Sequence, residues 1–133
     1  MARARIARKG DRTLQVFGET VIIRQDPTGA LAPLHCHGRE DEICYVIEGT
    51  FRIWRGNEVL DVGPGGIALL PRHQVHTFRN IGTDPGRILT VIQPAGFERF
   101  LEVVAERCLG DDMHELTAIA GEFGLKIVGL PPS

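Results

Sequence analysis

The feature that most restricts the fold of this chain is a series of short β-branched and apolar runs between residues 13 and 94. Gly, Pro, Asn and Asp separate the runs, as at residues 56–57 and 63–66, which is turn chemistry. Strands this short and numerous predict an all-β sandwich or barrel. The expected strands are residues 14–17, 20–25, 42–47, 50–55, 58–62, 67–70, 76–79 and 87–93.

After the last of these strands the apolar periodicity changes and predicts two helices. Apolar residues recur at the three-and-four spacing of an amphipathic helix from Phe97 to Cys108, and Gly110 is the expected end of that helix. Asp112, followed three residues later by Glu115, is a capping-box-like start for a second helix. The C-terminal part of the chain, after the last strand, is therefore expected to be helical.

The length and charge of the chain indicate one domain with a small-molecule partner. Its 133 residues suit one domain of ordinary size. We divide it into a basic N-terminal arm at residues 1–12, a β-barrel at 13–94 and a helical extension of the same domain at 95–133. With 15 Lys and Arg against 17 Asp and Glu, the near-neutral charge argues against broad nucleic-acid binding. The basic arm fits a solvated terminus or an edge strand.

Three further observations narrow the expected setting of the protein. No run approaches the roughly 20 apolar residues of a membrane helix, so no membrane partner is expected. The basic N-terminal residues are not followed by the long apolar run of an ordinary signal peptide. Cys36, Cys44 and Cys108 are an odd set without paired spacing, which suits a reducing compartment. We therefore expect a cytoplasmic protein.

Three histidines and one glutamate are the candidate chemical site. His35 and His37 are two residues apart, so in an extended strand both imidazoles point to the same face and can meet one ion. Glu42 begins the next run and can fold back beside them, while His76 arrives on a later strand. This donor set suits one divalent transition metal (Fe, Mn, Ni, Co, Cu or Zn) rather than calcium. In octahedral geometry it leaves two positions open for substrate or water.

Two sequence motifs surround these residues in order. The first is glycine, five residues, histidine, one, histidine, four, glutamate, six, glycine, matched by Gly29, His35, His37, Glu42 and Gly49. The second is glycine, five residues, proline, four, histidine, three, asparagine, matched by Gly65, Pro71, His76 and Asn80. Both motifs resemble those of the cupin superfamily. The strand-to-helix junction at residues 93–98 looks like that of quercetinase-like single-domain cupins.

The resemblance implies a fold, a ligand set and an assembly. The fold would be a double-stranded β-helix, the jelly-roll or cupin barrel, with two C-terminal α-helices. His35, His37, Glu42 and His76 would be the metal ligands, and the protein would be a homodimer. His73 stands where the second motif usually has glycine, and it is either a proton relay near the barrel mouth or an exposed turn histidine. Glu42 and His73 are thus the candidate catalytic residues.

Strand alternation predicts the wall of a substrate pocket beside this site. Cys44 and Val46 share the inward face with Glu42, and Phe78 shares it with His76. A mainly apolar wall of this kind would exclude water and favour a flat organic substrate.

Other residues near the site are expected to be solvated or structural. Glu40 and Asp41 adjoin Glu42, and because an adjacent strand residue faces the opposite way, we expect both in solvent. The aromatic residues of the helical region are assigned to packing: Phe97, Phe100 and Phe123.

Three functions are compatible with this site. The first is a metal-dependent enzyme acting on a small aromatic or enolisable metabolite, with dioxygenation as the leading reaction, because the sequence contains no other motif for difficult chemistry. The second is a redox-neutral cyclase or isomerase resembling cupins of polyketide pathways, in which the metal holds a β-dicarbonyl and either Glu42 or bound hydroxide moves a proton. The third is a non-catalytic cupin that binds a small ligand. Oxygen uptake during turnover separates the first two, and saturable binding without product would favour the third.

Overall fold

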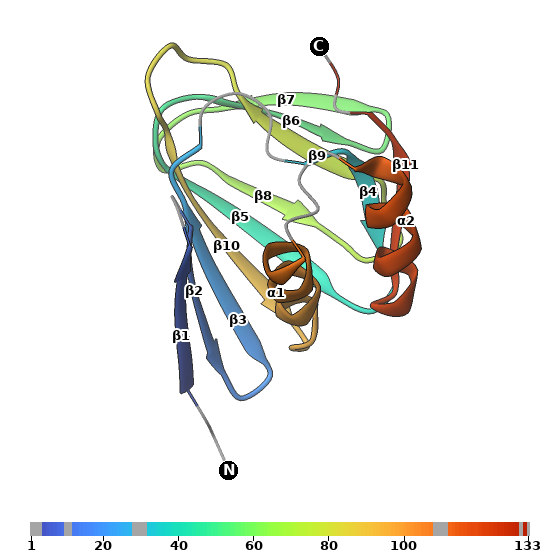
Figure 1. Ribbon diagram of the computed structural model, residues 1–133. Helices are drawn as coiled ribbons and strands as arrows, with labels where there is room; N and C mark the ends of the chain where they lie inside the picture. The colour runs from blue at the N-terminus through green and yellow to red at the C-terminus, as the bar shows by residue number, and fades with distance from the viewer. Residues whose placement is uncertain (1–3, 10–11, 28–31, 108–111, 131, 133) are drawn as a thin grey trace.

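The computed structural model describes residues 4–9, 12–27, 32–107, 112–130 and 132 (Figure 1). The elements of this part of the chain are the strands β1 (Ala4–Lys9), β2 (Arg12–Phe17), β3 (Thr20–Gln25), β4 (Leu34–His37), β5 (Asp41–Glu48), β6 (Phe51–Arg55), β7 (Glu58–Val62), β8 (Ile67–Leu70), β9 (His76–Asn80), β10 (Arg87–Gln93) and β11 (Leu125–Gly129), and the helices α1 (Phe97–Glu106) and α2 (Met113–Glu122).

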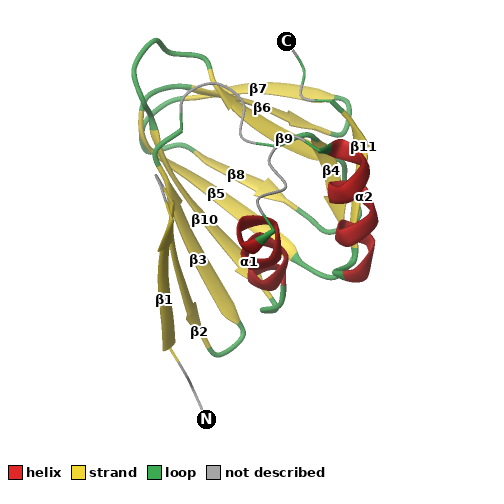
Figure 2. Cartoon of the chain, viewed as in Figure 1, coloured by secondary structure: helices red, strands yellow, loops and turns green. Residues whose placement is uncertain are grey.

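The strands form two antiparallel sheets that face each other, with both helices on one side of the pair (Figures 1 and 2). The larger sheet has the order β1-β2-β3-β10-β5-β8, and the smaller has the order β11-β4-β9-β6-β7. From β4 to β10 the chain passes repeatedly from one sheet to the other. This jelly-roll path places strands that are distant in the sequence side by side, such as β4 with β9 and β5 with β10.

The predicted all-β class with two C-terminal helices is confirmed. The strands expected at residues 20–25, 58–62, 67–70 and 87–93 have these bounds in the structure. β1 lies within the predicted basic arm and is the edge strand of the larger sheet, which agrees with one of the two alternatives given for that arm. β11 was not predicted, because its short run ends in glycine and directly follows a helix, and pairing with β4 is what makes it a strand.

Buried side chains form two clusters between the sheets. The first core cluster joins β2, β3 and β10 to both helices and contains Leu14, Val16, Val21, Ile23, Ile92, Phe97, Phe100, Leu116, Ile119, Ala120 and Leu125. The second core cluster joins β5, β6, β8, β9 and β10 and contains Cys44, Val46, Phe51, Ile53, Ala68, Leu70, Phe78 and Ile88. Burial alternates along β5, so that Glu42 points inward on the same face as the second cluster.

The two helices pack on the first core cluster. Asp112 caps α2 as predicted, because its side chain accepts a hydrogen bond from the Glu115 backbone N–H at 3.1 Å. α1 ends at Glu106, whereas Cys108 and Gly110, which were expected to close it, lie outside the described residues. Among the described residues, neither helix is long and apolar enough to cross a membrane.

The outer face of the larger sheet exposes several large apolar side chains. Ile43, Tyr45, Ile67 and Leu69 are all exposed, and antiparallel pairing places Ile43 opposite Leu69 and Tyr45 opposite Ile67. The expected homodimer stays a prediction.

Candidate metal centre

Strand β4 carries two of the predicted histidines, and β9 begins with the third. His35 and His37 are two residues apart on β4, and both are buried. The antiparallel pairing of β4 with β9 places His35 opposite His76. The sheet therefore brings together imidazoles from two distant parts of the sequence, as the motifs predicted.

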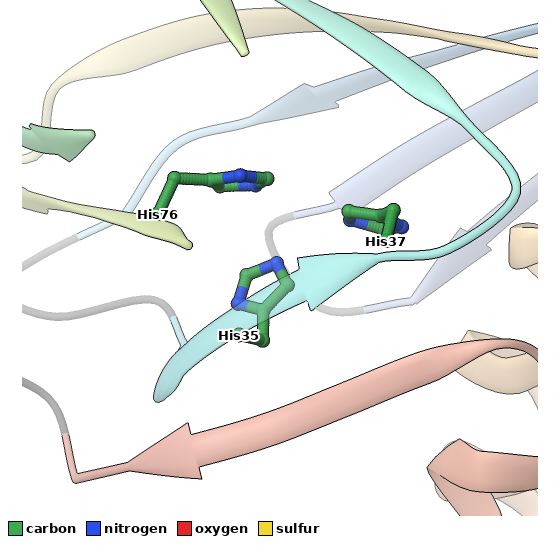
Figure 3. Close-up of side chains that lie close together, drawn as sticks. All are labelled: His35, His37 and His76. Atoms are coloured by element: carbon green, nitrogen blue, oxygen red, sulfur yellow. The ribbon is translucent and has the colours of Figure 1, made fainter. Parts of the chain in front are cut away.

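The three rings are close enough to share one ion (Figure 3). Their centroids are 5.1 Å apart for His35 and His37, 4.5 Å for His35 and His76, and 5.5 Å for His37 and His76. One nitrogen from each ring lies within 4.8 Å of the chosen nitrogens of the other two. Because zinc–nitrogen bonds are about 2.0–2.1 Å long, two nitrogens on one ion lie within about 4.2 Å of each other. Small ring movements would bring these nitrogens to that spacing, so the group could hold a metal ion.

Each histidine ring directs its Nδ1 atom at an oxygen. The contacts are His35 Nδ1 to the Pro33 carbonyl at 2.8 Å, His76 Nδ1 to the Gln74 carbonyl at 3.3 Å, and His37 Nδ1 to Glu40 Oε1 at 3.1 Å. Carbonyl and carboxylate oxygens accept hydrogen bonds, so these contacts place a proton on each Nδ1. In the neutral ring, the Nε2 lone pair is then free to bind a metal.

Two buried nitrogens support this fit. In the part of the chain that the structure describes, Nε2 of His37 and Nε2 of His76 are buried and have no hydrogen-bond partner. Leaving a buried polar atom without a partner costs about 1–3 kcal/mol. A divalent ion would satisfy both nitrogens, and imidazole nitrogen is a suitable ligand for the transition metals expected from the sequence. The residues present therefore fit the predicted ion.

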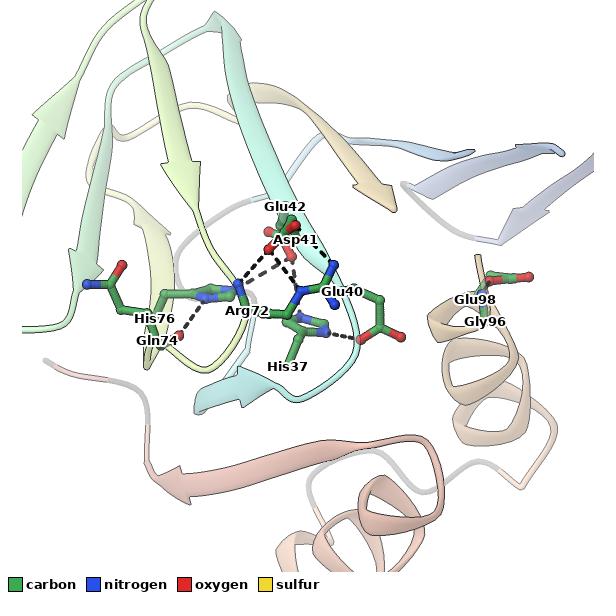
Figure 4. A network of polar contacts seen from close by, with 9 residues as sticks. All are labelled: His37, Glu40, Asp41, Glu42, Arg72, Gln74, His76, Gly96 and Glu98. Carbon is green, nitrogen blue, oxygen red and sulfur yellow. Dashed lines mark hydrogen bonds and ion pairs between the residues drawn. The ribbon is translucent and has the colours of Figure 1, made fainter. Parts of the chain in front are cut away.

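Glu42 on β5 places a carboxylate beside two of the histidines (Figure 4). Its Oε1 atom lies 3.4 Å from His37 Nε2 and 3.6 Å from His76 Nε2, and its side chain is only 5% exposed. The group of mutually close ligand atoms comprises the three histidines, and Glu42 borders that group on the side of His37 and His76. Its role as a fourth ligand and as a catalytic residue stays a prediction.

The expectation that Glu40 is solvated is wrong. Its side chain is 3% exposed and accepts the hydrogen bond from His37 Nδ1 (Figure 4). Glu40 belongs to the turn before β5, so the strand alternation on which the expectation was based does not apply to it. Asp41, the first residue of β5, is exposed as expected and forms a surface ion pair with Arg72.

Burial and the neighbouring charges give the site residues unusual protonation states. Burial, together with His76 and His37, lowers the pKa of His35 to about 4. Burial also opposes protonation of His37, but the contacts with Glu40 and Glu42 outweigh it and raise the pKa of His37 to about 9. Burial would raise the pKa of Glu42, yet His37 and His76 hold it well below its usual range. Near neutral pH the metal-free site thus contains a protonated His37, an ionised Glu42 and a neutral His35.

A cavity of about 550 Å³ adjoins the histidines. His35, His37 and Glu42 line it together with apolar side chains of both helices, among them Phe97 and Leu116. This volume lies within the roughly 300–1,000 Å³ of small-molecule sites, which are also mostly apolar with a few polar groups. The helices supply a large part of the wall, which alternation along the strands could not predict.

Of the three residues predicted for the pocket wall, Phe78 alone lines the cavity within the described part of the chain. Cys44 and Val46 point inward as expected, but both are fully buried in the second core cluster. The thiol of Cys44 donates a hydrogen bond to Glu42 Oε2 at 3.5 Å. Burial first, and then the charge of Glu42, raise the pKa of Cys44, so this residue remains a thiol.

His73 is an exposed residue of the turn between β8 and β9. Its φ angle is 70°, in the left-handed region that glycine adopts at lower cost, which explains why a glycine is usual at this position of the motif. Its backbone N–H donates to the His37 carbonyl at 2.7 Å. These features agree with the alternative of an exposed turn histidine, and a catalytic role for His73 stays a prediction.

The helical aromatic residues do more than the packing assigned to them. Phe97 and Phe100 belong to the first core cluster and also line the cavity. The Phe97 ring meets the His37 ring edge-on, with centroids 4.7 Å apart. Phe123 packs on Phe100 at 6.0 Å. A helix that starts at Phe97 directly after β10 was the available signal that this residue would reach the site.

Asn80, the last residue of the second motif, has a structural role. Asn80 is buried and donates to the carbonyls of Pro27 and Asp84 at 2.9 and 2.8 Å, while its Oδ1 accepts from the Gly82 N–H at 2.8 Å. It thereby fixes the loop between β9 and β10. Gly29, the first residue of the first motif, lies outside the described residues.

Comparison with known proteins gives one family match and two relatives. The family model described as Cupin_2, a cupin domain, matches residues 21–92. Uncharacterized protein MJ1618 of Methanocaldococcus jannaschii is 34% identical over 80 residues, which cover 60% of this chain and 61% of that protein. Quercetin 2,3-dioxygenase of Bacillus subtilis is 28% identical over 91 residues, which cover 68% of this chain and 25% of that protein. The chain thus spans less than two thirds of either relative.

Solved structures share the fold at low sequence identity. KdgF from Halomonas sp. has a TM-score of 0.53 and 21% identity, covering 74% of this chain and 83% of that one. Pac13 from Streptomyces, described as a nucleoside dehydratase, has a TM-score of 0.56 and 14% identity, covering 72% of this chain and 80% of that one. A protein with a double-stranded β-helix domain from Klebsiella pneumoniae has a TM-score of 0.53 and 21% identity, covering 70% of this chain and 76% of that one. These similarities concern the fold, and they agree with the double-stranded β-helix expected from the motifs.

Proposed function

The chain belongs to the cupin family, and we propose that it is a metal-dependent enzyme that acts on a small aromatic or enolisable metabolite. Because one fold of this kind hosts many reactions, the proposal has to come from the site rather than from the family. We further propose that His35, His37, His76 and Glu42 together hold one divalent transition metal.

The observation that carries the proposal is a group of three close imidazoles, two of which, those of His35 and His37, line an apolar cavity. The Nδ1 atoms of all three are engaged by oxygens, so each Nε2 is the nitrogen that can bind an ion once its ring is neutral. His35 and His37 line the same cavity as Phe97 and Phe78. A metal at this place would be next to space for a ligand, which is the arrangement of a reactive site rather than of a closed structural one.

A bound divalent ion would supply Lewis acidity, and a redox-active one would also allow electron transfer to dioxygen. The protein's own residues would orient the substrate and exclude water from it. The edge of Phe97 and the ring of Phe78 form apolar walls against which a flat substrate could pack. Glu42 is ionised and buried beside His37 and His76, so it is placed to accept a proton from an enol or phenol held there.

Dioxygenation is the leading reaction. The support is the match to quercetin 2,3-dioxygenase of Bacillus subtilis, which is 28% identical to this chain over 91 residues. The apolar wall is also suited to an aromatic substrate. The matching stretch is a quarter of that dioxygenase, so its substrate is not transferred to this chain.

The position of Glu42 favours a redox-neutral reaction as the second candidate. We infer that this buried, ionised carboxylate, which contacts two histidines, would accept a proton from the substrate without any need for an oxidant. Pac13, with which the chain shares its fold, is described as a nucleoside dehydratase, which is a redox-neutral activity. A cyclase, an isomerase or a dehydratase would each use the site in this way.

The experiment combines metal analysis of the purified chain with turnover assays. Protein loaded separately with Fe²⁺, Mn²⁺, Ni²⁺, Co²⁺, Cu²⁺ or Zn²⁺ is incubated with a panel of phenols and β-diketones, while dissolved oxygen and products are measured. We expect one ion per chain and, with a redox-active metal, oxygen uptake matched to substrate loss. Product without oxygen uptake would favour the redox-neutral reaction instead. Saturable binding of panel compounds without product from any metal form would contradict an enzymatic role and favour a binding protein.

A further inference from the structure

Glu40 is a buried carboxylate beside the candidate metal centre and is not one of its predicted ligands. Its side chain is 3% exposed, and its Oε1 accepts a hydrogen bond from His37 Nδ1 at 3.1 Å. The corresponding contacts of the other two histidines are made to backbone carbonyls, those of Pro33 and Gln74. His37 is therefore the one histidine of the described group whose Nδ1 atom is held by a charged side chain.

The surroundings of His37 fix its backbone and its ring. The His37 carbonyl accepts from the His73 N–H at 2.7 Å, and the next residue, Gly38, donates to the Gly124 carbonyl at 2.7 Å. The Phe97 ring lies edge-on to the imidazole with centroids 4.7 Å apart. With Nδ1 held by Glu40, the remaining ring nitrogen points toward Glu42 and His76 (Figure 4).

The negative charge of Glu40 also affects how strongly His37 can bind a metal. A carboxylate hydrogen-bonded to the distal nitrogen of a ligand histidine increases the donor strength of the other nitrogen, whereas a carbonyl does so less. Glu40 and Glu42 are both buried, and two negative charges within one site match the charge of a divalent ion.

We propose that Glu40 is a positioning residue of the metal centre, which holds His37 in the tautomer that presents Nε2 and strengthens that nitrogen as a ligand. The inference rests on the proposed metal-binding function. It concerns a side chain that does not touch the ion, so its effect passes through His37.

The test uses three variants of the full chain. Glu40→Gln keeps the size and the oxygen acceptor of the side chain but removes the charge. Glu40→Leu removes both the acceptor and the charge. Asp41→Asn is the matched control, because it removes a carboxylate from the adjacent position, where the side chain is exposed and pairs with Arg72. Zn²⁺ affinity is measured by competition with a chromophoric chelator, and ¹H–¹⁵N spectra of the zinc-loaded protein report the His37 Nδ1 proton.

We expect Glu40→Gln to weaken Zn²⁺ binding by about tenfold and Glu40→Leu by up to about a hundredfold. Metal affinity typically falls within this range when a side chain that hydrogen-bonds to a ligand histidine is replaced. Asp41→Asn should bind as the wild type does. The protected Nδ1 proton of His37 should persist in Glu40→Gln, because the amide oxygen still accepts it, and should be lost in Glu40→Leu. Loss of that signal reports the contact itself rather than the stability of the fold.

Wild-type affinity of Glu40→Gln would overturn the proposal, whether or not Glu40→Leu folds. The same holds if the variants lower the unfolding midpoint of the metal-free protein while Zn²⁺ affinity is unchanged, since Glu40 would then be purely structural. A wild-type chain that binds none of the tested ions would overturn the proposed function together with this inference. Tight wild-type binding with equal affinity in all variants would overturn this inference alone.

Discussion

The two core clusters of the barrel differ in what surrounds them. In the second core cluster, Cys44, Val46, Phe51, Ile53 and Ile88 are completely buried, and of its described members only Phe78 reaches the cavity. Many members of the first core cluster line the cavity on one side while packing against strands or helices on the other. We call the densely packed part of the barrel around the second core cluster the solid half. We call the part around the first core cluster and the cavity the hollow half.

The polar side chains of the interior follow the same division. The three histidines and Glu42 line or border the hollow half, where partners other than apolar side chains are available. Packing density stabilises a domain, whereas a binding site needs empty volume and buried polar groups, both of which cost stability. The comparison indicates that the chemistry belongs to the hollow half, where empty volume and buried polar groups cost stability, whereas the solid half is continuously packed.

The largest effect is expected when a histidine of the hollow half is replaced, which tests whether this half holds the metal. His76→Ala takes away one of three Nε2 atoms, so we expect loss of the bound ion. This effect is larger than the ten- to hundredfold loss of metal affinity that follows when a hydrogen-bond partner of a ligand histidine is removed. The unfolding midpoint of the metal-free protein should change little, because loss of the 3.6 Å ion pair with Glu42 is offset by removal of a buried nitrogen that has no hydrogen-bond partner. Metal analysis after gel filtration measures the first effect and urea unfolding the second.

His114→Ala is the matched control for this variant. His114 is exposed on α2, so its loss should leave the metal content unchanged. A His76→Ala chain that keeps its full complement of ion would show that the three histidines are not the metal site.

The converse change lies in the solid half. Phe51 is fully buried and pairs with Asn80, four residues along β9 from His76. Phe51→Ala should lower the free energy of unfolding by about 3–5 kcal/mol, since a buried aromatic ring is replaced by a cavity. Metal affinity of the folded fraction should match that of the wild type. A weakened metal site in this variant would mean that the two halves are coupled, contrary to the comparison.

The pH dependence of metal binding sharpens the account of the hollow half. In the metal-free protein the pKa of His37 is raised to about 9 and that of His35 is lowered to about 4, so of these two rings only His37 carries an extra proton between these values. A ligand imidazole must be neutral, and binding therefore displaces one proton. Metal affinity should rise about tenfold per pH unit, or about 1.4 kcal/mol, from pH 5 toward pH 9 and then level off.

Calorimetry of Zn²⁺ binding in buffers of different ionisation enthalpy measures this proton directly. We expect about one proton released per ion at pH 7. No proton release at pH 7, with an affinity independent of pH from 6 to 8, would show that His37 is neutral before the ion arrives.

The sequence predicted the solid half better than the hollow half. Inward positions such as Cys44 and Val46 follow from strict alternation along β5, and the strand bounds follow from turn residues on either side. The three histidines were also found, because their spacing places two on one strand face and a motif identifies the third. For a residue inside a regular strand such as β5, local rules were sufficient to predict which face it occupies.

What the sequence missed lies in turns and in contacts between distant elements. Glu40 was placed in solvent by a rule for strands, although it lies in the turn before β5. Cys44 and Val46 were assigned to the pocket, because alternation gives the face of a strand but not the depth at which a cavity ends. Phe97 was assigned to packing, since nothing in the helical period shows that α1 begins beside His37. These features depend on tertiary packing, which alternation and spacing do not contain.

The smallest expected effect concerns how firmly the helical wall of the hollow half is attached. Asp112 caps α2 through the Glu115 N–H, and Leu116 of this helix lines the cavity. Asp112→Ala should lower the free energy of unfolding by about 1 kcal/mol, whereas Asp112→Ser, which can still cap, should keep most of it. If the hollow half unfolds together with the solid half, urea unfolding of Asp112→Ala will show a lower midpoint with an unchanged slope. A midpoint equal to that of the wild type, with faster amide exchange confined to α2, would instead show that the helical wall opens independently of the barrel.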